Sequence, residues 1–253
     1  MSILSQSDIF VAQYGEDVVL ASIFNKRRGV CVEVGGFDGI TGSNTYFFEK
    51  LGWDCLIVEP VPSFCDQIRQ VRNCKIVEAA ASDGKGEIEF HIVEGAGTLS
   101  SSEITDAHLK RIHEEGGVLN RILVPRLPLT DILEAAAIGE IDFISIDVEG
   151  HELSVLRGFD LDRFRPRILI VEDNWSEVDS SVRDYLAGHN YIRFKRTGCN
   201  DWFARQGDPL LRKSAILKVG LTGVARRAKG HAKTILPDSV VGMLRRLRHA
   251  GSR

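Results

Sequence analysis

A glycine-rich segment at residues 35–39 directly follows a short apolar run at residues 30–34 of this 253-residue chain. The apolar run predicts a buried strand, and the glycines allow a tight turn behind it. A second apolar run, residues 55–58, ends at Glu59, twenty positions past the last glycine of the segment. Ligands of open α/β sheets lie at the carboxyl ends of the strands. This spacing therefore predicts a nucleoside-cofactor site, with the Glu59 carboxylate on a ribose.

The glycine segment differs from a dinucleotide-binding loop, which needs glycine at its first, third and sixth positions. Counted from Gly35, the third and sixth positions hold Phe37 and Ile40. The ring would obstruct a pyrophosphate, and the neighbouring acids Glu33 and Asp38 would repel it. S-adenosylmethionine has no phosphate, and its sulfonium and ammonium groups would be attracted by these carboxylates. The segment therefore favours S-adenosylmethionine over a nicotinamide dinucleotide. The alternative is an ordinary strand, turn and helix that binds no ligand, in which the glycines only allow the chain to bend.

Apolar runs alternate with amphipathic stretches along the chain, which is typical of a mostly parallel α/β sheet with helices on both faces. We expect strands at residues 30–34, 55–58, 75–79, 141–146, 168–171, 191–195 and 201–204. We expect helices at residues 16–24, 43–51, 63–71, 130–137, 152–156 and 176–187. An extra strand at 86–94 precedes a polar insertion, 95–120, with a candidate helix at 106–115. Long insertions beside a cofactor sheet often serve as substrate lids, and a surface loop without a task is the alternative.

Acidic residues and a histidine follow two of the expected strands. Asp147, Glu149 and His151 come after the strand at 141–146, and Glu172 and Asp173 end the strand at 168–171. The carboxyl ends of neighbouring parallel strands share one rim of the sheet, so these groups are expected to meet over the cofactor. His151, Asp147 or Glu149 would then be the general base for methyl transfer to a hydroxyl. The alternative is that His151 only begins the helix that follows and that Glu149 or Glu152 caps the N-terminus of that helix.

The same acids are also candidate metal ligands. Oxygen ligands without a nearby cysteine favour magnesium over zinc. The candidate Mg²⁺ ligands are Asp147, Glu172 and Asp173. Backbone N–H groups or the substrate could satisfy these carboxylates instead.

Several polar residues near expected strand and helix ends complete the candidate cofactor site. Ser43 and Asn44 either cap a helix or bind the amino-acid part of the cofactor. Ser82 and Asp83 either form a turn or reach the adenine edge. The candidate cofactor-binding residues are Gln13, Glu33, Gly35, Phe37, Asp38, Gly39, Ser43, Asn44, Glu59, Ser82, Asp83 and Asp147.

Taken together, these segments resemble the FkbM family of S-adenosylmethionine-dependent methyltransferases over about residues 12–174. The matching segments are Gln13-Tyr14-Gly15-Glu16-Asp17, Glu33-Val34-Gly35-Gly36-Phe37-Asp38-Gly39, Ser43-Asn44-Thr45, Gly52-Trp53, Glu59-Pro60, Ala81-Ser82-Asp83 and Ile146-Asp147-Val148-Glu149-Gly150-His151-Glu152. The resemblance implies a class I methyltransferase (Rossmann-like) fold, whose seven-stranded sheet has an antiparallel last strand. It also implies O-methylation of a sugar or other natural-product hydroxyl. The cofactor contacts that it implies are Glu33, Gly35, Asn44, Glu59 and Asp83. The chain departs from the family pattern at Ala12, because members of the family often have serine immediately before the glutamine that matches Gln13.

Acidic and basic residues are unevenly distributed along the chain. From residue 205 to the end, twelve Lys/Arg stand against two Asp, so this segment carries +10 and the rest −13. An acidic body argues against nucleic acid as a partner, because nucleic acid is bound chiefly through Lys/Arg contacts to phosphate. We expect a methyltransferase domain at 1–204 and a basic, partly amphipathic helical extension at 205–253. This extension is a candidate for contact with an anionic membrane surface, with an anionic glycan or lipid-linked acceptor, or with a second copy in a homo-oligomer.

The remaining features predict a cytoplasmic protein, with peripheral contact at the inner membrane surface through the basic extension. No apolar run approaches the roughly 20 residues of a spanning helix, and residues 1–8 lack a signal pattern. The five cysteines are odd in number and without CxxC spacing, which predicts reduced thiols. The function expected is O-methylation of a small-molecule or glycan hydroxyl. The alternatives are a nicotinamide-dependent oxidoreductase and a non-catalytic nucleoside-binding module.

Overall fold

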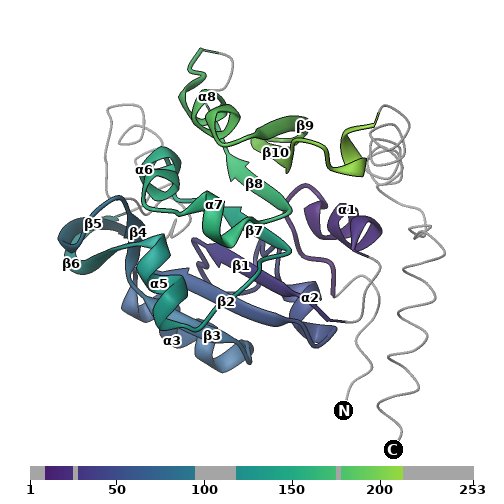
Figure 1. Ribbon diagram of the computed structural model, residues 1–253. Coiled ribbons are helices and arrows are strands. Elements are labelled where there is room, and N and C mark those ends of the chain that lie inside the picture. Colours follow the sequence, from purple (N-terminus) through teal and green to yellow (C-terminus); the bar gives the residue numbers. More distant parts are fainter. Residues whose placement is uncertain (1–8, 25–27, 95–117, 175–177, 213–253) are drawn as a thin grey trace, which may run out of the picture.

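The computed structural model describes residues 9–24, 28–94, 118–174 and 178–212, and its centre is a seven-stranded sheet (Figure 1). The strand order is β3-β2-β1-β7-β8-β10-β9. The bounds are β1 Val30–Val34, β2 Asp54–Glu59, β3 Lys75–Glu78, β7 Phe143–Ile146, β8 Ile168–Glu172, β9 Tyr191–Thr197 and β10 Asn200–Arg205. Each expected strand of the main sheet is present, with ends shifted by at most a few residues.

The direction of the last strand agrees with the expectation drawn from the family resemblance. β1 pairs in parallel with both β2 and β7, and β7 pairs in parallel with β8. β10 lies between β8 and β9 and is antiparallel to both. The carboxyl ends of β1, β2, β7 and β8 therefore share one rim, which is where the site lies.

Helices cover both faces of this sheet (Figure 1). Their bounds are α1 Glu16–Ile23, α2 Tyr46–Lys50, α3 Pro62–Val71, α5 Leu129–Ala135, α6 Glu152–Arg157, α7 Leu161–Phe164 and α8 Ser181–Gly188. Side chains alternate between the two faces of a strand. Val32 and Leu56 accordingly pack in one apolar cluster with residues of α5 to α8, whereas Cys31 and Phe143 pack in another with α1 and α2.

A second, three-stranded sheet lies beside the main one, at the left of Figure 1, in the order β4-β6-β5. Its strands are β4 Ala80–Ser82, β5 Gly86–Glu94 and β6 Val118–Pro128. β5 is the extra strand expected from the sequence. β6 was not expected, because Pro125 and Pro128 cannot donate ladder hydrogen bonds and weaken the strand pattern; its pairing with β5 nevertheless runs from Gly86 to Glu94. Residues 118–120 thus belong to a strand, and the candidate helix at 106–115 lies outside the described residues.

Two ends of the fold differ from expectation. α8 begins at Ser181 rather than at residue 176, and residues 175–177 are outside the described part. After β10, a short 3-10 helix, Pro209–Leu211, packs on the main body, where Arg167 Nε lies 2.8 Å from Asp208 Oδ2. Residues 213–253 are not described, so the helical extension and its partners stay predictions. Within the described ranges, no helix has both the length and the apolar character needed to cross a membrane.

Candidate active site

A cavity of about 540 Å³ opens at the shared rim of β1, β2, β7 and β8, a size typical of small-molecule sites. Most residues predicted for the site line it: Gln13, Glu33, Gly35, Phe37, Ser43, Asn44, Glu59, Ser82, Asp147, Glu149, His151 and Glu172. Four predicted residues are not among its lining: Asp38, Gly39, Asp83 and Asp173. Strand ends and the loops behind them therefore form one concave surface, as the sequence predicted.

The glycine loop is held against two strands by its own backbone. Gly35 has a left-handed φ of 89°, and a Cβ there would lie 1.8 Å from the carbonyl oxygen of Asp147. Only glycine can follow this path beside the end of β7. The N–H of Gly35 donates to Val58 O, and those of Gly36 and Phe37 donate to Glu59 Oε2, at 2.9 to 3.0 Å. These N–H groups bind protein acceptors, so they are not available to a ligand.

Glu59 anchors this loop from the end of β2. Its Oε2 accepts the two loop N–H groups, and its Oε1 accepts the N–H of Val61. The side chain is buried, and burial raises the pKa of Glu59 to about 7, although the three N–H donors favour the ionised form. Three of about four acceptor positions on the carboxylate are used. Glu59 still lines the cavity and can accept one more donor there.

Glu33 organises the polar segment that follows the loop. Its Oε2 accepts from the hydroxyls of Ser43 and Thr45 at 2.7 and 2.5 Å, and its Oε1 accepts from Asn44 N at 2.7 Å. Asn44 Nδ2 donates to Ser145 Oγ on β7. Among the described residues, Asn44 Oδ1 is a buried acceptor without a hydrogen-bond partner, and Asn44 lines the cavity. A ligand ammonium or amide would satisfy this oxygen.

Arg72, at the end of α3, supports the same segment from behind and was missed by the sequence analysis. Its side chain is fully buried and lies 2.6 Å from Glu49 Oε2 and 3.9 Å from Glu33 Oε2. It also donates to Gly39 O and to the hydroxyls of Ser43 and Thr45. No local sequence signal distinguishes this arginine from an exposed helix-end residue. It neutralises Glu33 without lining the cavity.

Asp38, Gly39 and Asp83 serve turns outside the cavity lining. Asp38 accepts from the backbone N–H groups of Ile40 and Thr41 and from the Thr41 hydroxyl. Such local bonds are the usual turn chemistry of aspartate. Gly39 has φ 82° and donates to Gly36 O. Asp83 follows β4 and accepts from Ser82 Oγ, so in this structure Ser82, not Asp83, reaches the cavity.

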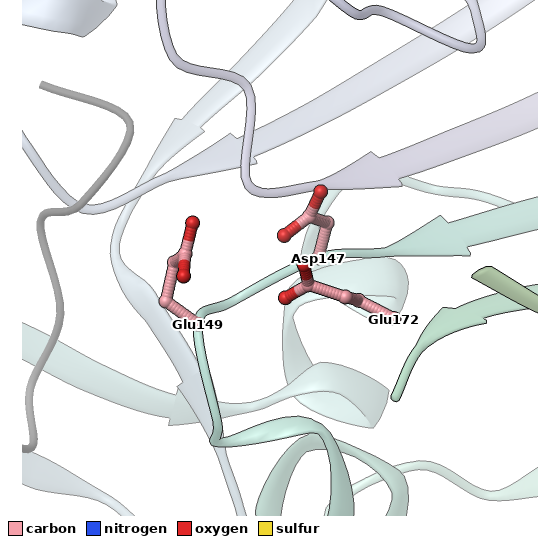
Figure 2. Close-up of side chains that lie close together, drawn as sticks. All are labelled: Asp147, Glu149 and Glu172. Atoms are coloured by element: carbon pink, nitrogen blue, oxygen red, sulfur yellow. The ribbon is translucent and has the colours of Figure 1, made fainter. Parts of the chain in front are cut away.

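Three carboxylates meet at the rim: Asp147 past β7, Glu149 in the next turn and Glu172 at the end of β8 (Figure 2). Ligand atoms of the three lie within 4.8 Å of one another. Burial, and then repulsion by Glu172, raises the pKa of Asp147 well above its usual range. Burial, and then the charges of Glu149 and Glu152, raises the pKa of Glu172 to about 7.

Asp173, the third metal ligand expected from the sequence, is not among the three clustered carboxylates. Successive strand residues point to opposite faces, so Glu172 and Asp173 cannot both face the cavity. The backbone N–H of Asp173 donates to Cys199 O, and its carbonyl oxygen accepts from Arg196. Glu149 takes the third place in the cluster, which the strand-end rule could not foresee because the position depends on the turn after β7.

That turn is held in a strained conformation. Glu149 has a left-handed φ of 52°, uncommon for a residue other than glycine, and Gly150 has φ 105°. Glu152, in the first turn of α6, accepts the N–H groups of Val148 and Gly150, both at 3.1 Å. His151 occupies the N-cap position of α6 and lines the cavity. The turn therefore brings Glu149 and His151 to the cavity. Of the residues in the capping alternative, His151 occupies the N-cap position by its backbone and Glu152 binds N–H groups at the start of α6.

The segment before α1 closes the cavity from the N-terminal side. Asp17 Oδ2 accepts the N–H groups of Val11 and Ala12 at 2.7 and 2.9 Å. Glu16 Oε2 accepts Tyr14 N, and its Oε1 accepts from Thr197 Oγ1 and Asn200 Nδ2. Both acids are completely buried. They hold the strip that carries Gln13 and Tyr14 against the cavity, so the acids of this motif are structural.

The strand order, the antiparallel β10 and a cavity at the carboxyl ends of β1 and β2 define an α/β protein with the class I methyltransferase sheet. The family described as "Methyltransferase FkbM domain" matches residues 33–193, well over half of the chain. The chain belongs to this family and is an S-adenosylmethionine-dependent methyltransferase. No curated protein sequence gives a significant match.

Three solved structures are similar at low sequence identity. Precorrin-6y C5,15-methyltransferase from Geobacter metallireducens GS-15 shares 11% identity, with 81% of this chain and 95% of that chain covered and a TM-score of 0.43. M. capricolum TrmK in complex with S-adenosyl-homocysteine shares 9%, covering 98% and 96%, with a TM-score of 0.41. Human methyltransferase-like protein 13 in complex with SAH shares 13%, covering 89% and 96%, with a TM-score of 0.44.

Proposed function

We propose that this methyltransferase transfers its methyl group to a hydroxyl of a sugar, glycan or small natural product. The observation that carries the proposal is the placement of Asp147, Glu149 and His151 on the rim that also carries the glycine loop. A hydroxyl must lose its proton to become a good nucleophile, and these groups can accept protons. Methyl transfer to an atom that has no proton to lose would not need them.

The described cavity fits S-adenosylmethionine by charge and by unmet hydrogen bonding. The oxygen Asn44 Oδ1 suits the ammonium of the cofactor, and the remaining acceptor position of Glu59 suits a ribose hydroxyl. Phe37 and Phe64 meet edge to face with ring centres 5.0 Å apart, and both line the cavity, so they offer an apolar wall for a purine. Gln13, Gly35, Ser43 and Ser82 line the same cavity and remain our candidates for further contacts.

In the proposed methyl transfer, the cofactor and the protein side chains have different tasks. S-adenosylmethionine, when bound, would supply an electrophilic methyl group, with its sulfonium sulfur as the leaving group that keeps the electron pair of the carbon–sulfur bond. His151 takes the hydroxyl proton at its imidazole, and the carboxylates orient the hydroxyl by accepting hydrogen bonds. The walls hold the acceptor in line, which supplies much of the rate enhancement.

Charge restricts the acceptor class. Among the described lining residues there is no Lys or Arg, whereas five are acidic: Glu33, Glu59, Asp147, Glu149 and Glu172. An acceptor that presents phosphate, sulfate or carboxylate to this surface would be repelled. A neutral polyhydroxyl compound would instead donate hydrogen bonds to the carboxylates. The same lack of cations disfavours a pyrophosphate cofactor, so the structure offers no support for a nicotinamide-dependent oxidoreductase.

A test combines a labelled methyl donor with extracts of cells that lack the gene for this protein. We expect the purified full chain to transfer label to the hydroxyl of one compound in the extract. Mass spectrometry should show that this acceptor, before labelling, is lighter than the native product by one methylene group. Label found on nitrogen, sulfur or carbon would overturn the proposal. Cofactor binding without label transfer to any compound in such extracts would favour the non-catalytic module.

A further inference from the structure

The aromatic ring of Tyr14 lies at the end of the cavity that is remote from the apolar wall of Phe37 and Phe64. Tyr14 is 37% exposed and lines the cavity. Its hydroxyl oxygen lies 3.9 Å from Cys199 Sγ, and the same sulfur lies 3.4 Å from Glu172 Oε1 at the end of β8. Strands β7 and β1 separate β8 from β2, which α3 and Phe64 follow. Tyr14 therefore borders the rim carboxylates and not the proposed purine site.

Gly198, in the turn between β9 and β10, covers one face of this ring. A Cβ at Gly198 would lie within 2.5 Å of three consecutive ring atoms of Tyr14, Cδ2, Cε2 and Cζ, at nearly equal distances. A point beyond the ring edge would be clearly farther from the two outer atoms than from the middle one, so this Cβ would lie over the face. Gly198 also has a left-handed φ of 58°. The glycine thus lets the ring lie flat on the turn, and the exposed part of the ring is its opposite face and its edge.

Buried Glu16 fixes the ring and the turn relative to each other. Its Oε2 accepts from Tyr14 N at 2.8 Å, and its Oε1 accepts from Thr197 Oγ1 at 2.6 Å and from Asn200 Nδ2 at 3.2 Å. Thr197 ends β9 and Asn200 begins β10, so the two residues flank the turn that carries Gly198. One side chain therefore ties the backbone of Tyr14 to both strands of the hairpin. A ring held in this way loses little conformational freedom when a ligand packs on it, which favours binding.

The chemical groups around the exposed face of Tyr14 select the kind of ligand. The face of an aromatic ring is electron-rich and attracts the weakly positive hydrogens of C–H groups. Glu149 and Glu172 line the same end of the cavity, and carboxylates accept hydrogen bonds from hydroxyl groups. A neutral pyranose offers both, because it has a face of C–H groups and hydroxyls around its edge. A planar phenol would cover the ring but bring few hydroxyls, and an anionic sugar would be repelled by the acids.

We infer that Tyr14 is a specificity-determining residue of this methyltransferase, and that its exposed face packs against the C–H face of a neutral pyranose unit of the acceptor. The inference deepens the proposed function and rests on it for transfer to a hydroxyl, although pyranose binding can be tested alone. Tyr14 takes no proton and forms no bond in the transfer. Its loss should therefore weaken acceptor binding and leave cofactor binding unchanged.

The direct test is saturation-transfer NMR of the full chain with S-adenosylhomocysteine and the methyl pyranosides of glucose, galactose and mannose. We expect the ring C–H protons of at least one glycoside to receive saturation from the wild-type protein. Tyr14→Leu should weaken this binding about tenfold, the order of magnitude of one aromatic contact. Tyr14→Phe keeps the ring and should bind like wild type. The matched control is Tyr185→Leu, at a half-buried tyrosine outside the described lining, which should also bind like wild type.

Gly198→Ala tests the packing of the ring without altering Tyr14. The new Cβ would occupy the place of the ring, so the ring must move and glycoside binding should weaken as in Tyr14→Leu. Gly139→Ala is the control, because a Cβ there meets nothing within 4 Å. Calorimetry with S-adenosylhomocysteine shows which variants remain folded, and the comparison of Tyr14→Leu with Tyr14→Phe decides if Gly198→Ala is not. Full glycoside binding by a folded Tyr14→Leu, or no glycoside binding by the wild type, would overturn the inference.

Methyl transfer separates this inference from the proposed function. We expect the acceptor found in the extracts to be a glycoside whose KM rises in Tyr14→Leu while kcat changes little. Label on the hydroxyl of a compound without a sugar ring would overturn the inference and leave the proposed function standing. Glycoside binding that depends on Tyr14, with methyl transfer only to nitrogen or carbon, would refute the proposed function and leave the pyranose site standing.

Discussion

Arg72 Nε lies 2.6 Å from Glu49 Oε2, which ties the end of α3 to the end of α2 beneath the cofactor loop. The arginine side chain has no exposed surface, and the glutamate side chain is 7% exposed. Arg72 also binds Gly39 O and the Ser43 hydroxyl. The pair therefore joins two helices to the end of the glycine loop and to Ser43, which lines the cavity.

Arg72→Met should lower the free energy of unfolding by about 3–5 kcal/mol, because it leaves Glu49 and Glu33 buried without their cation. Cofactor affinity should fall as well, since Ser43 and Thr45 lose a donor. Urea titration and calorimetry measure the two effects. The matched control is Arg69→Met in the same helix, whose partners Asp66 and Glu78 are exposed; its unfolding should be nearly unchanged. Equal free energies of unfolding for the two variants would show that the buried Arg72–Glu49 pair stabilises the protein no more than the exposed pairs of Arg69 do.

Gly35→Ala should destabilise the protein by more than about 1–3 kcal/mol, the usual cost of a strained backbone, because its Cβ would also collide with Asp147 O. The loop would have to move away from β7, so cofactor binding should weaken too. Thermal unfolding and calorimetry measure both. Gly139→Ala is the control, since a Cβ there meets nothing within 4 Å and needs no positive φ. A fully stable Gly35→Ala that binds cofactor normally would contradict this path of the loop.

Glu59 should make stability depend on pH. Its pKa is raised from 4.5 to about 7 in the folded protein, so the folded state holds the proton more tightly than the unfolded chain does. The resulting stabilisation is complete below about pH 4.5 and is lost as the pH rises through about 7. Glu59→Gln lacks this loss, so its stability relative to wild type should improve between pH 5 and pH 8. Urea titrations at both pH values measure the difference, and an unchanged or opposite difference would refute the raised pKa.

Glu59→Ala should weaken cofactor binding by about tenfold or more, because a ribose hydroxyl and the loop N–H groups lose a charged acceptor. Calorimetry with S-adenosylmethionine measures this. Glu78→Ala is the control: Glu78 is exposed, occupies the corresponding end of β3 and is not part of the described cavity lining. Identical affinities for wild type and Glu59→Ala would exclude the ribose role.

His151→Ala should lower kcat by about a hundredfold or more while cofactor affinity changes little, as expected for a lost general base. Asp147→Ala should have a similar effect on turnover through the loss of a rim carboxylate. Steady-state kinetics with the native acceptor tests both. His189→Ala, a half-buried histidine that packs on Tyr185 outside the described lining, should leave kcat unchanged. Full turnover in both rim variants would remove these residues from the mechanism.

Local pattern was sufficient for most of the fold. The run at 30–34 is β1 with the bounds expected, because three valines and a cysteine of this five-residue run lie between a glycine and a glycine turn. The pattern failed for β6, whose prolines argue against a strand and whose partner β5 lies across the undescribed residues 95–117. It also placed the start of α8 five residues early. Pairing energy across a sheet is not visible in a short window of sequence.

The site was predictable only in part, because contacts between residues distant in the chain are not visible in a short window of sequence. Strand-end positions predicted that Asp147 and Glu172 would meet, and the structure brings them together. The cluster contains Glu149 where the sequence predicted Asp173, and this depends on the left-handed conformation of Glu149 in the turn after β7. The roles of Arg72 and Glu16 depended on burial among residues distant in the chain, such as Glu33 and Thr197.

The sequence by itself determined the strands of the main sheet, the glycine turn behind β1 and the acids at the ends of β2, β7 and β8. These features depend on backbone conformation and hydrophobic periodicity, which neighbouring residues decide. Only the tertiary structure decided which acids face the cavity, which are neutralised from behind and which merely hold turns. Those outcomes depend on the direction of each side chain and on the charges brought near it by folding, and a linear pattern contains neither.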